Sequence, residues 1–316
     1  MSDLFQSADG LPAAILFPGQ GSQRKGMLKS LCEKHPELRD PVGSLLDLAG
    51  KEWISLLGSE EGLDWTTSRT AHLAIVVAGI TSFRLLLQRD MLRPQFLAGH
   101  SLGELTALAC ANVLTDQQVI RLALARGEAM DLAAEKMPGG MMAVVGMEMK
   151  RVEEILDKMR DEEEARIWLA NINAPNQIVV AGSPEALEKG KPKLEEQGGR
   201  VIPLATAGAF HTPLMRSAAD RFAEALASET WGEPSIPVVS SRTGKRITTT
   251  ASLRSALTLQ MLQPVLWTDT MAFLKRAGVT RVVEMPPAGV LTNLAKRLEF
   301  QHILEMDTVF EKDVVN

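Results

Sequence analysis

FLAGHSLGE, residues 96–104, is the stretch that decides the fold of this chain. Its apolar start is typical of a buried strand, and Gly99 to Gly103 match G-x-S-x-G, in which a serine lies on a sharp turn between a strand and a helix. Glycines flank such a serine because a side chain there would collide with the neighbouring backbone. The helix-forming run Glu104–Asn112 follows. We therefore predict a strand-turn-helix unit that exposes the hydroxyl group of Ser101.

An earlier stretch repeats this organisation. Ala13–Phe17 is an apolar run that ends at PGQGSQ, which predicts a buried strand followed by a glycine-rich turn. Strands that alternate with helices favour an α/β fold with a largely parallel sheet. In such folds the active site lies at the carboxyl ends of the strands, so this edge of the sheet is where we expect the chemistry.

The middle of the chain follows a different pattern. It predicts the order βαββαβ, which is the ferredoxin-like arrangement. Because this unit lies between GHSLGE and later α/β elements, we interpret it as an insertion at residues 134–205 into a discontinuous large domain of residues 1–133 and 206–316. The predicted elements of the insertion are strand 141–147, helix 149–162, strands 167–171 and 177–181, helix 184–197 and strand 201–204.

Composition narrows the class of protein. The chain of 316 residues has a hydrophobic fraction of 45% and a charged fraction of 23%, as soluble globular proteins do. The N-terminus MSDLFQSADG lacks the basic start and apolar run of a secretory signal, so we expect a cytoplasmic protein. The apolar run Leu73–Ile80 is shorter than the roughly 20 residues of a membrane span, so we expect no membrane partner. A net charge of -5 argues against general binding of nucleic acid.

Metal and cofactor motifs are missing from the sequence. Cys32 and Cys110 cannot form a disulfide framework and have no metal-ligand spacing, so we expect buried or unused thiols. Gly19-Gln20-Gly21 does not complete the phosphate-binding pattern G-x-G-x-x-G, because Arg24 takes the place of the third glycine. We therefore expect neither a metal nor a bound cofactor.

A serine nucleophile requires a base, and the chain has only five histidines. His35 and His302 are expected at the surface, and His100 points away on such a turn, which leaves His72 and His211. We favour His211 because it follows a strand-like segment and a loop downstream of the serine, as in the chain order of α/β-hydrolases. No acidic residue identifies itself as a third member, so a dyad held by a backbone carbonyl and a full triad both stay open.

Six motifs occur in one order along the chain: FPGQGSQ, GHSLGE, ARGEAM, NAPNQIVVAG, GAFHTPLM and LQPVLW. On these motifs the chain resembles the malonyl-CoA:acyl-carrier-protein transacylases of fatty-acid and polyketide synthesis, from about Ala13 to Leu298. The resemblance implies an α/β-hydrolase-like large domain with an inserted ferredoxin-like subdomain. It also implies an acyltransferase that moves a malonyl group from malonyl-CoA to the phosphopantetheine thiol of an acyl carrier protein.

The resemblance assigns catalytic roles to particular residues. It makes Ser101 the nucleophile and His211 its general base and acid. It places the oxyanion hole at Gln20 and the backbone N–H of Leu102. The main-chain carbonyl of Gln260, in QMLQPVLW, holds the histidine ring. The implied reaction is ping-pong through a malonyl ester of the serine, and coenzyme A takes part only as a portion of the substrate.

The resemblance also implies a second group of residues that bind and select the substrate. Arg126 in ARGEAM matches the arginine that grips the free carboxylate of malonate, and a guanidinium fork suits this task because it holds a carboxylate by two parallel hydrogen bonds. Phe210 resembles the bulky ring of malonyl-selective members, so methylmalonyl should fit poorly. His100 and His72 complete the substrate-binding candidates. His72 stands where the family commonly has glutamine and adds a titratable ring beside the pocket.

Two further departures concern acyl specificity more than reaction type: Pro286-Pro287-Ala288 replaces a usual Gly-Pro-Gly turn, and Ser240-Ser241 stands where asparagine is frequent. Carrier proteins are usually acidic, so we expect a docking surface with excess positive charge on a monomeric enzyme. The candidate docking residues are Lys189, Lys191, Lys193, Arg200, Lys296 and Arg297.

Other functions are compatible with the same serine and histidine. A hydrolase that releases acyl groups from carrier proteins would use Ser101 and His211, but it would not need Arg126 to hold a diacid. A transferase that moves a different acyl group between carrier proteins also stays open. The intact serine and histidine argue against a non-catalytic adaptor. The sequence does not distinguish a fatty-acid pathway from a polyketide pathway.

Overall fold

Strand β1 (Ala13–Phe17) lies in the middle of the large sheet of this protein, whose computed structural model describes residues 12–206 and 208–313. The odd-numbered residues of β1 belong to the hydrophobic core on one face of the sheet, and the even-numbered residues belong to the core on the other face. A strand that is apolar at every position is typical of a parallel sheet with both faces covered, so the apolar sequence of β1 reflects its central place.

The large sheet has the strand order β10-β9-β1-β2-β7-β8. All neighbouring strands pair in parallel except β8, which pairs with β7 in the antiparallel direction. Because β1 and β2 are parallel neighbours, the PGQGSQ and GHSLGE turns that follow them meet at one edge of the sheet. The other strands are β2 (Phe96–Gly99), β7 (Val238–Ser240), β8 (Lys245–Ile247), β9 (Arg281–Glu284) and β10 (His302–Glu305).

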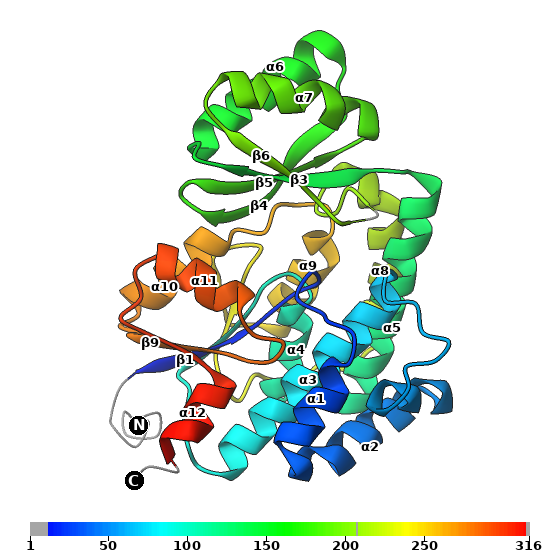
Figure 1. Ribbon diagram of the computed structural model, residues 1–316, viewed down its shortest axis with the longest axis vertical. Coiled ribbons are helices and arrows are strands. Elements are labelled where there is room, and N and C mark those ends of the chain that lie inside the picture. The colour runs from blue at the N-terminus through cyan, green and yellow to red at the C-terminus, as the bar shows by residue number, and fades with distance from the viewer. Residues whose placement is uncertain (1–11, 207, 314–316) are drawn as a thin grey trace.

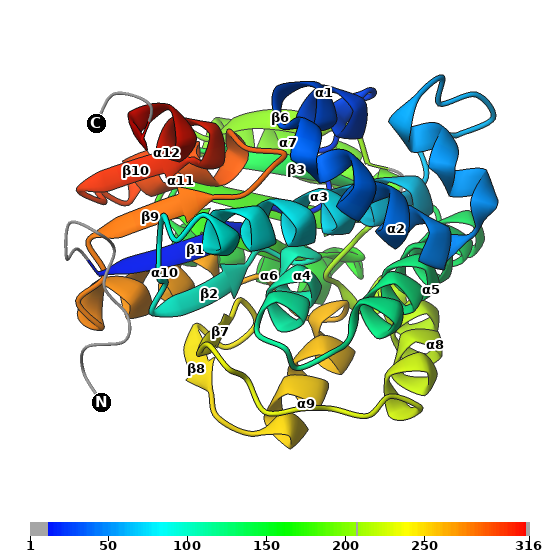
Figure 2. The same ribbon diagram turned by 90° about the horizontal axis from the view of Figure 1, so that it is seen from below.

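Helices cover both faces of the large sheet (Figures 1 and 2). Residues of α3, α4 and α5 pack into the core on one face, and residues of α10 and α11 pack into the core on the other. The α-helices are α1 (Met27–Lys34), α2 (Arg39–Ala49), α3 (Ser68–Gln88), α4 (Gly103–Cys110), α5 (Asp116–Lys136), α8 (Arg216–Ala227), α9 (Thr250–Gln260), α10 (Trp267–Arg276), α11 (Val290–Arg297) and α12 (Met306–Asp313). Short 3-10 helices span Pro36–Leu38, Lys51–Leu57 and Pro213–Met215.

A second sheet of four strands lies above the first in Figure 1, with two helices on its outer side. Its strand order is β4-β5-β3-β6, all neighbours are antiparallel, and it has a hydrophobic core of its own. The chain runs through it in the predicted order βαββαβ. The elements are β3 (Gly140–Val145), α6 (Met149–Glu163), β4 (Ile167–Ala174), β5 (Gln177–Gly182), α7 (Pro184–Glu196) and β6 (Arg200–Leu204).

The predicted elements of this unit differ from the observed ones mainly at β4. The prediction ended this strand at Asn171, but the strand continues to Ala174. It continues because β4 makes antiparallel pairs with β5 as far as Ala174, and because Ile172 also donates a backbone hydrogen bond to Val265, which lies outside the four-stranded unit. The extension matters for function, since it carries Asn173 toward the serine turn. The predictions for residues 1–10 and for Ala207 of the TAGAF loop lie outside the described residues.

Helix α3 is long and apolar enough to cross a membrane by length and composition alone, with a mean hydropathy of 1.7. The apolar run Leu73–Ile80 is therefore only part of a longer apolar helix. Small and weakly polar residues on both sides of the run extend α3 to 21 residues. In the structure, 89% of the apolar window is buried inside the protein. Figure 2 shows α3 in the middle of the helical layer, between α1 and α4, which is the place of a core helix.

Candidate active site

The candidate nucleophile Ser101 lies on the turn between β2 and α4 with a backbone φ of 52°, in the left-handed region that residues other than glycine rarely adopt. The turn is sterically tight. A Cβ atom on Gly99 would lie 1.9 Å from the backbone carbon of Gly103, and a Cβ atom on Gly103 would lie 2.0 Å from the carbonyl oxygen of Phe17. Only glycine fits at both positions, which is the physical reason for the G-x-S-x-G spacing.

His211 reaches this serine across 110 positions of sequence. The Ser101 hydroxyl and His211 Nε2 lie 2.8 Å apart, and His211 Nδ1 lies 2.7 Å from the backbone carbonyl oxygen of Gln260. Because a carbonyl only accepts, Nδ1 carries the proton and Nε2 is left to accept the serine proton. Among the described residues no acidic side chain is hydrogen-bonded to His211, so the geometry is that of a dyad held by a backbone carbonyl.

Arg126 lies directly behind the serine. Its side chain, on α5, is 1% exposed, and Nη2 donates to the Ser101 hydroxyl at 3.1 Å and to the side-chain oxygen of Gln260 at 3.0 Å. The guanidinium therefore lies next to the oxygen atom that would carry an acyl group, and its hold on a substrate carboxylate stays a prediction. In the structure, these protein acceptors occupy both hydrogens of Nη2.

His72, on α3, connects Arg126 to Gln20. Its Nε2 atom lies 3.1 Å from Arg126 Nη1 and 2.9 Å from the side-chain oxygen of Gln20. A single ring nitrogen can form a full hydrogen bond with only one of these groups at a time. The ring is completely buried, so the prediction that it lies beside the pocket needs correction. His72 lies behind the residues that face the cleft.

The amide of Gln20 is directed toward the interior, because its nitrogen donates to the hydroxyl of Ser68 at 3.1 Å and its oxygen lies 2.9 Å from Nε2 of His72. The backbone N–H groups of Gln20 and Leu102 form no hydrogen bond with another described residue. The groups still available to bind an oxyanion are therefore these two backbone N–H groups, one from each turn at the sheet edge. The amide side chain of Gln20 supports the turn.

A cleft of about 350 Å³ opens in front of Ser101, between the small sheet and α11. Phe210 is 6% exposed and lines this cleft, as the sequence predicts. His100 also lines it, and its Nε2 atom lies 2.8 Å from the side-chain oxygen of Asn173 on β4. The contact joins the serine turn to the small sheet. Arg126, by contrast, lies behind Ser101 and is not exposed to the cleft.

Two groups of residues escaped the sequence prediction. Asn171 and Asn173 line the cleft from β4, and their alternate spacing in an otherwise apolar strand was a usable signal, because residues two apart share one face. The other group is Glu104 with the amide side chain of Gln260. The nitrogen of this amide donates to the backbone oxygen of Ser101 and to Oε2 of Glu104, at 3.0 Å each. These contacts join residues more than 150 positions apart in the sequence, so no local sequence pattern predicts them.

Burial and the guanidinium decide the charge states of this site. Burial, followed by the charge of Arg126, lowers the pKa of His211 to about 3 and the pKa of His72 well below its ordinary value. Both rings are therefore neutral near pH 7. Burial lowers the pKa of Arg126 to about 10, which leaves it charged. Burial raises the pKa of Glu104, while hydrogen bonds from Ser240, Ser241 and Gln260 oppose the rise.

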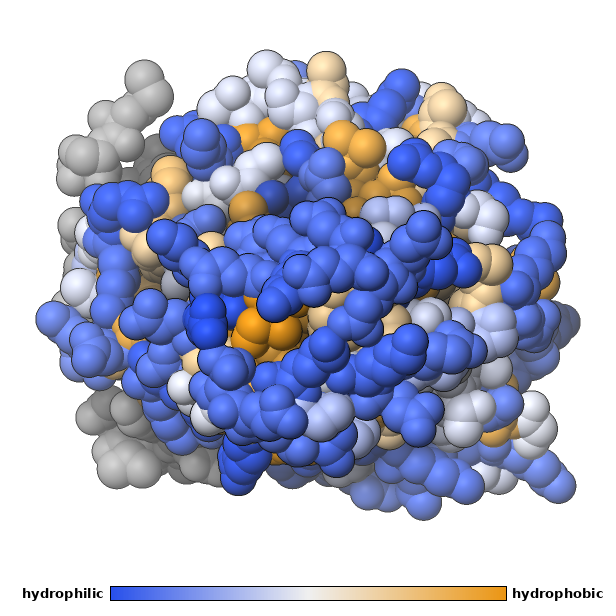
Figure 3. All heavy atoms as spheres, turned by 90° about the horizontal axis from the view of Figure 1, so that it is seen from above, coloured by the Kyte–Doolittle hydropathy of each residue, from blue (hydrophilic) through white to orange (hydrophobic). Residues whose placement is uncertain are grey.

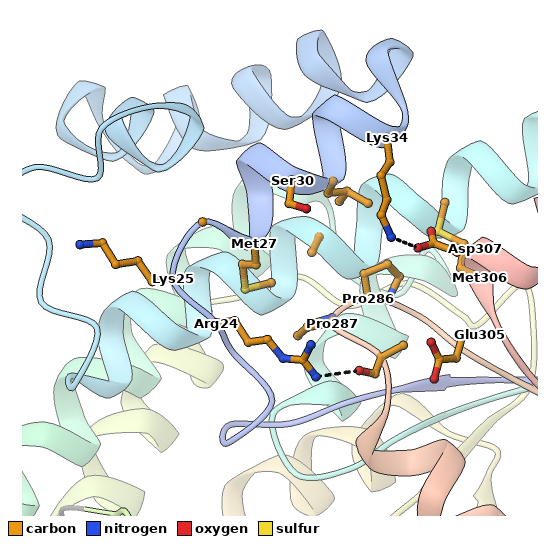
Figure 4. Close-up of a pocket in the computed structure, with 14 residues that line it drawn as sticks. Arg24, Lys25, Met27, Ser30, Lys34, Pro286, Pro287, Glu305, Met306 and Asp307 are labelled. Carbon is orange, nitrogen blue, oxygen red and sulfur yellow. Dashed lines mark hydrogen bonds and ion pairs between the residues drawn. The ribbon is translucent and has the colours of Figure 1, made fainter.

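A separate cavity of about 290 Å³ lies beside α1 (Figure 4). Arg24 reaches into it from the loop before α1, while the side chain of Lys25 points away in Figure 4, and Glu305 and Asp307 line it from the C-terminal elements. Lys34 is paired with Asp307 at 2.6 Å across one end. Cationic and anionic side chains thus share this cavity, and it contains none of the residues that surround Ser101.

The outer face of α6 and α7, seen from above in Figure 3, is mostly hydrophilic. Two lysines predicted to dock a carrier protein lie on this unit in ion pairs, Lys191 with Glu195 at 3.9 Å and Lys193 with Glu163 at 2.6 Å. Their charges are balanced locally. Lys296 and Arg297 instead end α11, the helix whose first turns line the cleft, and both are exposed.

Among enzymes with an α/β fold, a serine and histidine arranged in this way are typical of those that transfer acyl groups. Residues 15–306 match the acyl transferase domain family, and the chain belongs to that family. The malonyl CoA-acyl carrier protein transacylase of Mycobacterium bovis is 37% identical over 289 residues, which are 90% of this chain and 92% of that protein. Its counterpart from Salmonella typhimurium is 32% identical over 286 residues, with the same two coverages.

Solved structures agree with this membership. FabD from Acinetobacter baumannii superposes with a TM-score of 0.88 at 34% identity, over 96% of this chain and 99% of that one. A malonyl-transacylase solved in complex with a type II polyketide synthase acyl-carrier protein, PlMCAT:AntF, has a TM-score of 0.87 at 31% identity, over 95% and 99%. The overall α/β fold is therefore shared along nearly the whole chain, as the sequence motifs predicted.

Proposed function

We propose that this protein transfers a malonyl group from malonyl-CoA to the phosphopantetheine thiol of an acyl carrier protein, through an ester on Ser101. One observation carries the proposal: a buried guanidinium, that of Arg126, lies 3.1 Å from a serine hydroxyl that is itself 2.8 Å from an imidazole nitrogen. The imidazole activates the hydroxyl, and the guanidinium provides a partner for the second acid group of a short diacid.

In the first half-reaction, His211 accepts the proton of Ser101 while the serine oxygen attacks the thioester carbonyl of malonyl-CoA. The backbone N–H groups of Gln20 and Leu102 stabilise the oxyanion of the tetrahedral intermediate. As the intermediate collapses, the C–S bond breaks, and the protonated His211 gives its proton to the departing thiolate of coenzyme A. The Gln260 carbonyl stabilises the imidazolium that exists between these two transfers.

In the second half-reaction, the thiol of the carrier protein takes the place that coenzyme A has left. His211 accepts the thiol proton, the sulfur attacks the malonyl ester, and the proton returns to the oxygen of Ser101 as the ester C–O bond breaks. Water must compete poorly at this stage. A guanidinium that anchors the malonyl carboxylate keeps the ester in the orientation that suits the incoming thiol.

The names of the relatives support both substrates, since curated relatives are malonyl CoA-acyl carrier protein transacylases and one similar structure holds an acyl-carrier protein. We further propose an α/β-hydrolase-like large domain of residues 1–133 and 206–316 and a ferredoxin-like subdomain of residues 134–205. The strand order β4-β5-β3-β6 supports this description of the smaller unit. We also propose a monomeric cytoplasmic enzyme that requires no cofactor besides its substrate and has no nucleic-acid or membrane partner.

Incubation with malonyl-CoA followed by intact mass measurement tests the proposed function. A malonyl adduct on Ser101 that persists until a carrier protein is added is the expected result, with no adduct in Ser101→Ala. Rapid release of free malonate without a carrier protein would instead identify a hydrolase. Competition among malonyl-, methylmalonyl- and acetyl-CoA for one carrier protein tests selectivity, where the ring of Phe210 should exclude the α-methyl group.

A further inference from the structure

Glu104, the last residue of GHSLGE, is a buried carboxylate that the mechanism above does not use. It lies in the first turn of α4 beneath the serine turn and is 1% exposed. Its Oε2 atom accepts hydrogen bonds from the backbone N–H of Ser241 at 3.3 Å, from the hydroxyl of Ser241 at 2.9 Å and from the amide of Gln260 at 3.0 Å. Among the described residues Glu104 has no direct ion pair.

Two of the three groups that contact Oε2 of Glu104, the backbone N–H of Ser241 and the amide nitrogen of Gln260, can only donate, and the hydroxyl of Ser241 can donate as well. These donors favour the ionised carboxylate and oppose the effect of burial, which raises the pKa of Glu104. The amide of Gln260 joins Glu104 to the buried guanidinium of Arg126, because its nitrogen donates to the carboxylate and its oxygen accepts from the guanidinium. The charge of Glu104 in turn raises the pKa of Arg126 against the effect of burial.

The carboxylate fixes the orientation of that amide. Because Glu104 only accepts, the NH₂ group of Gln260 must face it, and the amide oxygen must then face Arg126. If the amide were turned over, its oxygen would face the carboxylate and its NH₂ group would face the guanidinium. Both contacts would be repulsive.

We propose that Glu104 is a positioning residue that, through the Gln260 amide, holds Arg126 in the place required to bind the free carboxylate of the substrate. The proposal rests on the proposed function, because it concerns the diacid selectivity of the same site. It adds that this selectivity depends on a group that never touches the substrate. His211 does not depend on this orientation, since it is held by the backbone oxygen of Gln260 and not by its side chain. The same amide nitrogen also donates to the backbone oxygen of Ser101 at 3.0 Å, so the serine turn loses one hydrogen bond if the amide turns over.

Glu104→Gln tests the proposal, because it keeps the shape of the side chain but can donate as well as accept, so the Gln260 amide is free to turn over. We expect KM for malonyl-CoA to rise on the order of tenfold, the size of one lost charged hydrogen bond, and the preference for malonyl-CoA over acetyl-CoA to fall by a similar factor. Acylation by acetyl-CoA and inactivation by a neutral sulfonyl fluoride should fall by a clearly smaller factor than acylation by malonyl-CoA, because the hydrogen bond between His211 and the backbone of Gln260 stays in place.

Two further variants complete the test. Ser241→Ala removes one donor to Glu104 and should shift the malonyl preference in the same direction by a smaller factor, which keeps the proposal testable if Glu104→Gln does not fold. Glu229→Gln is the matched control, because it alters a glutamate that is 5% exposed and pairs with Arg121 away from the cleft. It should change thermal stability alone.

Each remaining outcome overturns the proposal. An unchanged malonyl preference in folded Glu104→Gln would show that Arg126 holds its position without Glu104. Equal losses with malonyl-CoA, acetyl-CoA and the sulfonyl fluoride would show that Glu104 supports the serine turn and not the arginine. Failure of the wild-type enzyme to form any malonyl adduct would refute the proposed function itself, a result that these variant comparisons keep separate.

Discussion

Arg126→Ala separates the acid-binding group from the catalytic pair. In the wild-type site, Nη2 of Arg126 can exchange its bonds to Ser101 and Gln260 for bonds to a substrate carboxylate. A hydrogen bond of this charged kind contributes about 1.5 to 3 kcal/mol, so its loss should lower kcat/KM for malonyl-CoA roughly 10- to 150-fold. Acetyl-CoA makes no such bond, so its kcat/KM should fall much less than that of malonyl-CoA. Burial still lowers the pKa of His211 in this variant, while the smaller effect of the Arg126 charge is removed together with its hydrogen bond to the Ser101 hydroxyl.

The assay is competitive acylation of Ser101 by equal concentrations of malonyl-CoA and acetyl-CoA, with the two adducts resolved by intact mass. Because the substitution leaves the acceptors on Gln260 and His72 without their donor, thermal unfolding must show that the variant is folded. Arg126→Lys is the companion variant, since it keeps a charge but loses the fork. An unchanged ratio of adducts, or an equal loss of both, would refute the assignment of Arg126 to the carboxylate.

Three other predictions concern the rest of the site. Gln20→Ala should lower kcat by less than tenfold, because the backbone N–H remains; a loss of about 100- to 1000-fold would show that the side chain is an oxyanion donor. Acylation should have no acid limb near pH 6.5, because the free base His211 has a pKa of about 3 and stays neutral as the pH falls toward that value; a pH-rate profile with a limb at the ordinary histidine pKa would contradict this. Replacing Lys296 and Arg297 together with alanine should raise KM for the carrier protein but not for malonyl-CoA, and equal KM values for both proteins would remove this docking site.

Local sequence was enough to predict the central strand β1 and the serine turn. The apolar run of β1 and the glycines around Ser101 act through their immediate neighbours, so their consequences can be read from a short window. The choice of His211 followed because few histidines were available and the chain order was informative. The resemblance of six motifs then pointed to a family that the comparisons confirm along residues 15–306.

The tertiary structure alone decided how these groups work together. The sequence predicted that Gln20 binds the oxyanion. Its side chain is directed toward Ser68 and His72, so its backbone N–H is the group that can bind the oxyanion. Sequence could not show that Glu104 and Arg126 meet the same amide of Gln260, because these contacts join α4, α5 and α9 across more than 130 positions. A buried hydrogen bond depends on which donors and acceptors packing brings within 3 Å, and packing is a property of the whole fold.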